Sequence, residues 1–228
     1  FGYNTSWYGP LERMLHGKGV VNFVPIQYQD GTATRIEPVW HEDLRRDIAV
    51  FRAGSMDRFG NFNYGVTNGG TRKDVINSPI KIVEVNSNFP TVLGGMDESI
   101  NIDEIDYIIE SSNQEMFCIP HMEPEDVEVR IAENIIPLIK DGACLQLGIG
   151  GVPNDIGKMI AQSDLKDLGV HSEMFCDAFF DLYKAGKITN MKKKRDTGRS
   201  VFTFTLCTKE TMDFLDNNPL VASYNCDY

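Results

Sequence analysis

Basic side chains are scarce in this sequence. Of its 228 residues, 22 are Lys or Arg and 33 are Asp or Glu, which gives a formal net charge of −11. Proteins that bind nucleic acid need clustered positive charge to neutralise phosphates. The composition therefore argues against non-specific nucleic-acid binding. One basic run, Lys192–Arg195, interrupts the acidic chain. The Asp, Thr and Gly that follow it favour a solvated loop over the alternative, a site for a nucleotide phosphate.

Cysteine pairs with metal-binding or redox spacing are also absent. The five cysteines are irregularly spaced, without a CxxC pair and without a histidine at zinc-finger distance. Scattered thiols of this kind are typical of a reducing compartment. We therefore predict a cytoplasmic protein with no metal or redox cofactor. The cysteines stand at positions 118, 144, 176, 207 and 226.

Long apolar runs are missing too. The longest fall far short of the roughly 20 residues needed to cross a bilayer, and no signal peptide is visible, so we predict no membrane partner. The sequence begins at Phe1 rather than at a methionine and stops at Tyr228, shortly after a strand–helix pattern. We therefore expect it to be part of a longer protein.

The first half alternates short helix and strand patterns. A helix-like stretch covers residues 9–19, and residues 111–126 carry two prolines without clear periodicity, which predicts a domain boundary there. Strands alternating with helices are typical of a mixed or mostly parallel sheet with helices on its faces. The predicted strands are residues 20–28, 48–51, 80–86 and 107–110.

The second half shows a cleaner pattern. Helical periodicity covers residues 125–140, although Pro137 should strain the last turn. Strand–turn–helix units follow three times, at residues 142–160, 168–186 and 201–218. Three such units in succession predict a doubly wound parallel sheet, in which ligands bind at the carboxyl ends of the strands.

The first of these turns is rich in glycine. It reads Gly148-Ile149-Gly150-Gly151-Val152-Pro153-Asn154, with the proline suited to a first helical turn. Glycines allow close approach of a ligand, and the exposed N–H groups of a helix start attract anions. The turn lacks the Lys-Ser/Thr ending of a phosphate loop and the spacing of a GxGxxG fingerprint. A purely structural turn remains the alternative.

The second turn holds His171, Ser172 and Glu173. In one interpretation, Ser172 or Asp177 is the helix N-cap and Glu173 is a carboxylate in the first helical turn. In the other, Glu173 lies at the ligand edge of the sheet as a base or nucleophile. His171 and Ser172 are neighbours on a predicted strand, so their side chains point to opposite faces. No GxSxG elbow exists either, and we exclude a serine hydrolase.

Several segments, in order, resemble one known family. Residues 145–160 and 168–190 closely resemble the acetyl-CoA hydrolase/transferase family, and within it the 4-hydroxybutyrate and butyrate:acetate CoA-transferases. Residues 55–65, 82–95 and 100–111 resemble its first domain. The resemblance implies an α/β protein of two Rossmann-like open α/β/α units, the CoA-transferase fold, the second with a mostly parallel sheet. Residues 1–115 would be the rest of the N-terminal domain, and residues 125–228 the start of the second.

The resemblance also implies the chemistry. A glutamate at the position of Glu173 attacks acyl-CoA, and a glutamyl-CoA thioester then passes CoA to a second carboxylic acid in a ping-pong mechanism. The substrates would be acyl-CoA, with coenzyme A as carrier, and a small carboxylic acid, and the protein would be a homo-oligomer. An acyl-CoA hydrolase with the same glutamate, and a non-catalytic CoA-binding module, are the alternatives. Both the start of the first domain and a C-terminal Gly-rich segment would lie outside this sequence.

The remaining site residues are inferred from the same resemblance. Two groups are involved, one in each half of the chain. Those implied to bind CoA are Gly150, Gly151, Val152, Pro153 and Asn154, and those implied to line the cleft are Ser55, Met56, Asp57, Gly60 and Asn86. Family members often have Asp where this chain has Asn154, so the resemblance leaves its contact undefined.

Overall fold

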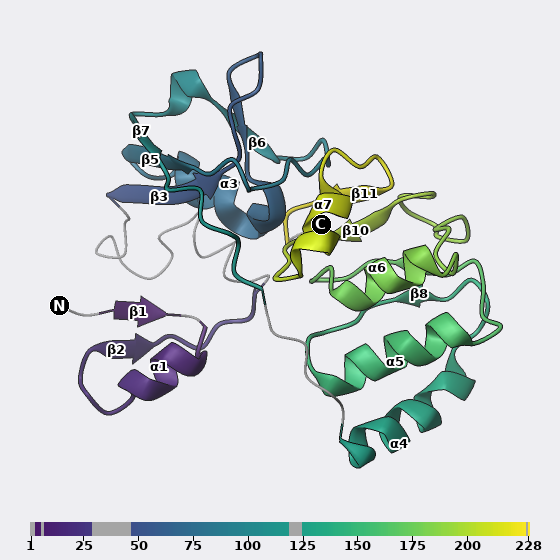
Figure 1. Ribbon diagram of the computed structural model, residues 1–228. Helices are drawn as coiled ribbons and strands as arrows, with labels where there is room; N and C mark the ends of the chain where they lie inside the picture. Colours follow the sequence, from purple (N-terminus) through teal and green to yellow (C-terminus); the bar gives the residue numbers. More distant parts are fainter. Residues whose placement is uncertain (1–2, 6, 29–46, 119–124, 227) are drawn as a thin grey trace.

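The protein is an α/β structure built from short parallel strands and helices (Figure 1). This computed structural model describes residues 3–5, 7–28, 47–118, 125–226 and 228. Among these residues, no helix is long and apolar enough to cross a membrane. The class predicted from the sequence, α/β with parallel sheets, is confirmed. The division into units 1–115 and 125–228 stays a prediction, and residues 119–124 of the predicted boundary lie outside the described residues.

The first half contains a three-stranded parallel sheet with the order β3-β5-β7. Alternate residues of β3 are buried because they face α3, which the sequence places between β3 and β5. Smaller two-stranded sheets pair β1 with β2 in parallel and β4 with β6 in antiparallel fashion. The elements of this half are β1 (Tyr3–Thr5), α1 (Pro10–Leu15), β2 (Val21–Phe23), β3 (Ile48–Ala53), β4 (Asn61–Asn63), η2 (Gly65–Thr67), α3 (Asn68–Ile76), β5 (Ile80–Val85), β6 (Ser99–Asn101), η3 (Ile102–Glu104) and β7 (Tyr107–Glu110).

The second half follows a β-α-β-α-β-α-β order after an initial helix. Strand β8 pairs with β9, and β10 pairs with β11, all in parallel. An isolated parallel bridge between His171 and Val201 joins the chain after β9 to β10, so the four strands lie side by side. The elements are α4 (Asp126–Ile135), η4 (Ile136–Leu138), β8 (Cys144–Leu145), α5 (Gly151–Gln162), β9 (Gly169–Val170), α6 (Asp177–Lys184), β10 (Ser200–Phe202), α7 (Lys209–Leu215) and β11 (Val221–Ser223).

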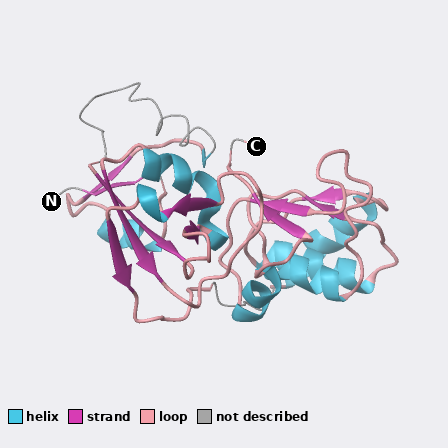
Figure 2. Cartoon of the chain, turned by 90° about the horizontal axis from the view of Figure 1, so that it is seen from above, coloured by secondary structure: helices cyan, strands magenta, loops and turns pink. Residues whose placement is uncertain are grey.

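Helices α4, α5 and α6 stack against one another in that order (Figure 1). Figure 2 shows the helices of this half gathered mainly on one side of its strands. Their apolar faces meet β9 and β10 in the largest cluster of buried side chains, which includes Ile160, Phe179 and Phe202. Burial of these side chains is the main force that holds the second half together.

The two halves share part of this core. Val66 and Phe89 of the first half belong to the same buried cluster. The backbone N–H of Ser223 donates to the carbonyl oxygen of Leu93 at 2.8 Å. A Cβ at Gly94 would lie 2.3 Å from the carbonyl oxygen of Ser223, so only glycine permits this approach. The end of β11 is therefore fixed against the first half.

Two sequence predictions of local structure need correction. The strand predicted at residues 20–28 is shorter in the structure, where only Val21–Phe23 form β2, and the side chains of β2 are exposed or half-buried. The helix predicted for 125–140 ends as an α-helix at Ile135, and residues 136–138 form a 3₁₀ turn. Proline at position 137 lacks an N–H and its ring crowds the preceding turn, so the α-helix cannot continue through it. This second outcome agrees with the strain expected there.

Candidate active site

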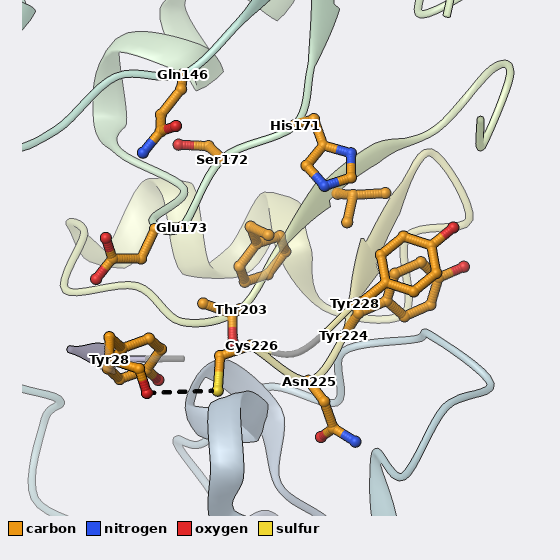
Figure 3. A pocket seen from close by; sticks show the side chains of 12 residues that line it. Tyr28, Gln146, His171, Ser172, Glu173, Thr203, Tyr224, Asn225, Cys226 and Tyr228 are labelled. Carbon is orange, nitrogen blue, oxygen red and sulfur yellow. Dashed lines mark hydrogen bonds between the residues drawn. The ribbon is translucent and has the colours of Figure 1, made fainter. Parts of the chain in front are cut away.

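A pocket of about 270 Å³ opens at the carboxyl ends of the parallel strands of the second half (Figure 3). Its walls include Gln146 after β8, Glu173 after β9, Thr203 after β10 and Tyr224 after β11. Each strand end therefore delivers at least one polar side chain to the same cavity. This is the edge at which open α/β sheets bind their ligands. Tyr28, from the first half, completes one side.

The chain alternates between exposed and buried residues around Glu173. Ser172 and Met174 are buried and His171 and Glu173 are exposed, and of these four all but Met174 line the pocket. Phe175, next along the chain, is fully buried among other aromatic rings. This alternation follows the two-residue period of an extended strand, whose successive side chains point to opposite faces. It turns Glu173 towards solvent while its neighbours anchor the backbone.

The backbone of Glu173 is fixed but its carboxylate is not. The Glu173 carbonyl oxygen accepts hydrogen bonds from the N–H groups of Thr203, at 3.0 Å, and Phe204, at 3.2 Å. Among the residues that the structure describes, the carboxylate accepts no hydrogen bond and forms no ion pair. Figure 3 shows Gln146 and Ser172 on one side of this carboxylate and Tyr28 on the other. An exposed, unpartnered carboxylate on a rigid backbone is suited to act as a nucleophile.

The interpretation of this turn as a helix cap is wrong. Helix α6 begins at Asp177, four residues beyond Glu173, and its N-cap is Cys176 without a side-chain cap bond. The Ser172 hydroxyl donates to the carbonyl oxygen of Leu147 at 3.3 Å. That bond engages the hydroxyl of this buried side chain.

Asp177 holds α6 to the start of α7 instead of capping its own helix. Its Oδ1 accepts from the backbone N–H of Thr208, at 3.0 Å, and from the Thr208 hydroxyl, at 2.7 Å. The Thr211 hydroxyl donates to the same oxygen. This network fixes the loop after β10 next to the pocket wall.

The glycine-rich turn forms the start of α5. Gly150 is the N-cap, and its φ of 126° is a conformation that L side chains rarely adopt. None of the five residues from Gly150 to Asn154 lines the pocket that contains Glu173. A Cβ at Gly151 would lie 2.2 Å from a carboxylate oxygen of Glu128, so an acidic side chain of α4 already lies at this helix start. Their role in CoA binding stays a prediction.

The five residues predicted to line the cleft lie elsewhere in the first half. Ser55 and Met56 are exposed in the loop after β3, and none of the five lines the Glu173 pocket. The Asp57 carboxylate accepts hydrogen bonds from the backbone N–H groups of Phe59 and Asn61, both at 2.8 Å. These two bonds lower the pKa of Asp57, the bond from Asn61 most of all.

Gly60 and Asn86 likewise have local structural contacts. Gly60 has a φ of 83°, and its N–H donates to the Asp57 carbonyl oxygen at 3.1 Å. The buried side chain of Asn86 accepts a hydrogen bond from the Asn88 N–H at 2.9 Å through its amide oxygen. Its amide nitrogen donates to the Gln114 carbonyl oxygen, also at 2.9 Å. These contacts stabilise turns, and a role in substrate binding stays a prediction.

The basic run contacts the protein more closely than a solvated loop would. Lys193 is half-buried, and its ammonium donates to the carbonyl oxygens of Val170, at 2.8 Å, and Arg199, at 2.6 Å. Burial lowers the pKa of Lys193. The guanidinium of Arg195 lies over the ring of Tyr228, 4.8 Å from its centre. The solvated-loop interpretation is therefore wrong for Lys193.

His171 lies between this run and the pocket. Its ring stacks on Tyr228 with centroids 5.9 Å apart. Burial lowers the pKa of His171, and the positive charges of Lys193 and Arg195 lower it further, against the opposing effect of Asp196. The imidazole is therefore favoured in its neutral form at the pocket wall.

Two buried polar side chains of the pocket have an atom without a partner. Thr203 is 6% exposed and Asn225 is 4% exposed. Within the described part of the chain, Thr203 Oγ1 and Asn225 Oδ1 make no hydrogen bond. Asn225 Nδ2 donates to Asp97 at 2.8 Å, which orients the amide and leaves its oxygen as an acceptor. Buried polar atoms without partners are rare in native proteins, and a polar ligand is one explanation.

Sequence reasoning missed most of this pocket. Thr203 and Asn225 each follow a short apolar strand, so the rule that placed Glu173 at a strand end could also have found them. Gln146 follows β8 in the same way, but the prediction for that segment was based on its glycines. Tyr28 and Cys226 carry no local signal, because only the fold brings them to the site.

Metal binding has no support in the described residues. Across residues 3–5, 7–28, 47–118, 125–226 and 228, no group of three or more His, Cys, Asp or Glu side chains is arranged to hold a metal ion. The chemistry available at the pocket is that of its carboxylate, its imidazole, its hydroxyls, its side-chain amides and a thiol.

Comparison with known proteins identifies the relatives of this chain. Residues 6–120 match the family model described as the acetyl-CoA hydrolase/transferase N-terminal domain. The chain is 43% identical to a probable butyrate:acetyl-CoA coenzyme A-transferase of Syntrophomonas wolfei, over 80% of this chain and 41% of the relative. It is 39% identical to the butyryl-CoA:acetate CoA-transferase of Anaerostipes caccae, over 100% of this chain and 50% of the relative.

A solved structure is similar along the whole chain. The crystal structure of RipA from Yersinia pestis superimposes with a TM-score of 0.90 at 31% sequence identity, over 100% of this chain and 52% of that one. The chain thus spans about half the length of the curated relatives it matches.

Proposed function

Since this chain belongs to the acetyl-CoA hydrolase/transferase family, we propose that the complete protein moves CoA between an acyl-CoA and a short-chain carboxylate, with Glu173 as the nucleophile. The observation that carries the proposal is the exposed Glu173 carboxylate, which has no partner among the described residues and lies in a pocket at the strand ends. Of the relatives named above, that of Anaerostipes caccae is described as a CoA-transferase and that of Syntrophomonas wolfei as a probable one.

The reaction proceeds in two half-reactions. A carboxylate oxygen of Glu173 attacks the thioester carbonyl, the C–S bond breaks, and CoA leaves as a thiolate while a mixed anhydride forms. The thiolate then attacks the glutamyl carbonyl, which releases the acid and leaves a glutamyl-CoA thioester. A second carboxylate attacks that thioester, and the same steps in reverse return Glu173 as a free carboxylate. No proton is transferred in this sequence, so no general base is required.

The local structure favours this role for Glu173. A carboxylate in a tight salt bridge would be a poor nucleophile, because a paired anion gives up part of its charge density. Both backbone hydrogen bonds to the Glu173 carbonyl oxygen hold the residue in place without touching the carboxylate. Binding of the long CoA moiety can then be used to lower the barrier at the thioester.

The rest of the site assignment belongs to the same proposal. The turn from Gly150 to Asn154 binds CoA, and the loops carrying Ser55–Gly60 and Asn86 approach the substrate from the first domain. The chain consists of two open α/β/α units, residues 1–115 and 125–228, and the protein is a homo-oligomer of the cytoplasm. None of the five cysteines, all of which the structure describes, is part of a disulfide, which suits a reducing compartment.

Two alternatives make different predictions. A hydrolase would use the same glutamate and pass the acyl or glutamyl group to water, so CoA release would not depend on acetate. Acetate-independent release at a comparable rate would contradict the transferase. A non-catalytic CoA-binding module would bind CoA, and a Glu173→Ala variant of the complete protein would behave like the wild type in every assay.

The decisive experiment is mass spectrometry of the complete protein after incubation with acetyl-CoA or butyryl-CoA. We expect a CoA adduct on the peptide that contains Glu173, which borohydride converts to the corresponding alcohol. A Glu173→Gln variant should form no adduct, because a neutral amide is a far weaker nucleophile than a carboxylate anion. Glu210→Gln, an exposed glutamate on α7, is the matched control and should label like the wild type. Turnover by the wild type without any adduct on this peptide would refute the assignment.

A further inference from the structure

A thiol lies in the same pocket as the proposed nucleophile. Cys226, three residues beyond β11, lines the pocket together with Glu173 and Thr203. It is half-buried, and its Sγ lies 3.9 Å from the carbonyl oxygen of Tyr28, the contact drawn as a dashed line in Figure 3. The cavity of about 270 Å³ is small, so any group bound between Glu173 and Thr203 lies close to this thiol.

The polar atoms around Cys226 point independently to a ligand. Asn225 Oδ1 and Thr203 Oγ1 are buried and have no partner in the described residues. One can only accept a hydrogen bond and the other can donate one. A secondary amide carries both complementary groups, and the pantetheine arm of CoA contains such amides next to its sulfur. The surroundings of Cys226 are therefore matched to the end of CoA that carries the sulfur.

We propose that Cys226 is a modification site for CoA itself, at which thiol–disulfide exchange with CoA disulfide forms a mixed disulfide and closes the pocket. The Cys226 thiolate attacks one sulfur of CoA disulfide. The S–S bond of the CoA disulfide breaks, a Cys226–CoA disulfide forms, and the second CoA leaves as a thiolate that takes up the proton lost by Cys226. CoA disulfide is the oxidant, so the step needs no other redox partner.

This modification would switch the proposed reaction off under oxidising conditions. A CoA moiety bound through Cys226 occupies the space that acyl-CoA needs near Glu173. A thiol donor reverses the step by the same exchange. The inference rests on the proposed CoA chemistry of this pocket, because recognition of the CoA moiety is what directs the exchange to Cys226.

The test compares Cys226 with Cys144, which is a more exposed thiol on β8 outside the pocket. The complete protein is incubated with CoA disulfide or with hydroxyethyl disulfide, and the modified peptides are quantified by mass spectrometry over time. We expect the ratio of labelling at Cys226 to labelling at Cys144 to be about tenfold or more higher with CoA disulfide than with hydroxyethyl disulfide. The reason is that binding of the CoA moiety raises the local concentration of the disulfide at Cys226. Dithiothreitol should remove the label.

Variants separate this inference from the proposed function. CoA disulfide should inactivate the wild type and a Cys144→Ser variant, and it should leave the residual turnover of Cys226→Ser constant over time. Equal labelling of both cysteines by both disulfides, or inactivation of Cys226→Ser at the wild-type rate, would overturn the inference even if Glu173 forms its adduct. Absence of turnover in the wild type would contradict the proposed function, whereas the labelling ratio would still decide the role of Cys226.

Discussion

The backbone N–H of Thr203 donates to the carbonyl oxygen of Glu173 at 3.0 Å, while the Thr203 hydroxyl is buried and has no partner among the residues that the structure describes. The two residues come from the ends of neighbouring strands β10 and β9. The same residue therefore positions the proposed nucleophile through its main chain, while its hydroxyl makes no bond to the described part of the protein. A hydroxyl buried without a hydrogen bond lowers the stability of the folded protein, so its removal should have a measurable effect.

Replacing Thr203 by Val should leave stability unchanged or raise it by up to about 1 kcal/mol, because the change removes an unpaired hydroxyl and keeps the shape. The matched control is Thr205→Val. The Thr205 hydroxyl donates to the carbonyl oxygen of Phe175, and its loss should lower stability by about 1–3 kcal/mol. Thermal unfolding measures both, at about 2–4 °C per kcal/mol for a chain of this size. A similar loss in both variants would show that Thr203 Oγ1 has a partner.

The ammonium of Lys193 connects two neighbouring strands. It donates to Val170 on β9 and to Arg199 just before β10. Lys193→Met keeps most of the side-chain volume but leaves two carbonyl oxygens without a donor, so we expect a loss of about 3 kcal/mol in the free energy of unfolding.

Lys194→Met is the matched control for Lys193. Its side chain is exposed and has no hydrogen bond or ion pair within the described part of the chain. Its effect should stay within about 0.5 kcal/mol. Denaturant titration of the three proteins distinguishes the cases, and equal stability of both variants would mean that Lys193 is solvated, as the sequence suggested.

Sequence reasoning succeeded where the signal was local. Glu173 follows a buried apolar strand, and strand geometry predicted that the neighbours His171 and Ser172 face opposite ways; in the structure His171 is exposed and Ser172 is buried. The break in the helix at Pro137 was predictable for the same reason, since a missing N–H acts within one turn. In contrast, Asp177 looked like a cap because Asp is common there, but its carboxylate bonds to threonines 31 and 34 positions away.

The pocket itself depends on long-range pairing. Tyr28 and Cys226 meet across a sequence separation of 198 positions, and no periodicity encodes such a contact. The sequence also favoured a ligand site at the Gly150–Asn154 turn, whereas the pocket at Glu173 recruits Gln146 a few residues earlier. The residue of a strand-end loop that reaches the cavity depends on where the strand ends. Intrinsic strand propensity cannot locate the ends of a strand as short as β8.

Thiol reactivity should differ sharply between the cysteines. Burial raises the pKa of Cys176 to about 11 and that of Cys207 to about 12. At pH 8 their thiolate fractions are therefore about 10⁻³ and 10⁻⁴, and the thiolate is the reactive form. We expect iodoacetamide to alkylate exposed Cys144 in the native protein and to spare Cys176 and Cys207, as peptide mapping would reveal. In denaturant all three should react. Rapid native labelling of Cys176 would contradict its burial.

The carboxylate of Glu128 beside Gly151 bears directly on the proposed CoA turn. Helix α5 presents free N–H groups at this end, and an anion there gains from the helix dipole. Glu128 already supplies one negative charge, so a CoA phosphate at the same position would be repelled. Glu128→Gln keeps an oxygen that can accept the Glu125 N–H and removes the charge. We expect CoA to bind about two- to fivefold more tightly to this variant, which corresponds to about 0.4–1 kcal/mol.

Glu133→Gln is the matched control for Glu128, because it makes the same charge change at an exposed position of α4. Isothermal titration of CoA against the complete protein should give the wild-type affinity for this variant. The gain at Glu128 should shrink as salt is added, since exposed charges are screened within about 10 Å at 0.1 M ionic strength. An equal gain in both variants would indicate a general effect of net charge, and no gain in either would place the CoA phosphates away from the start of α5.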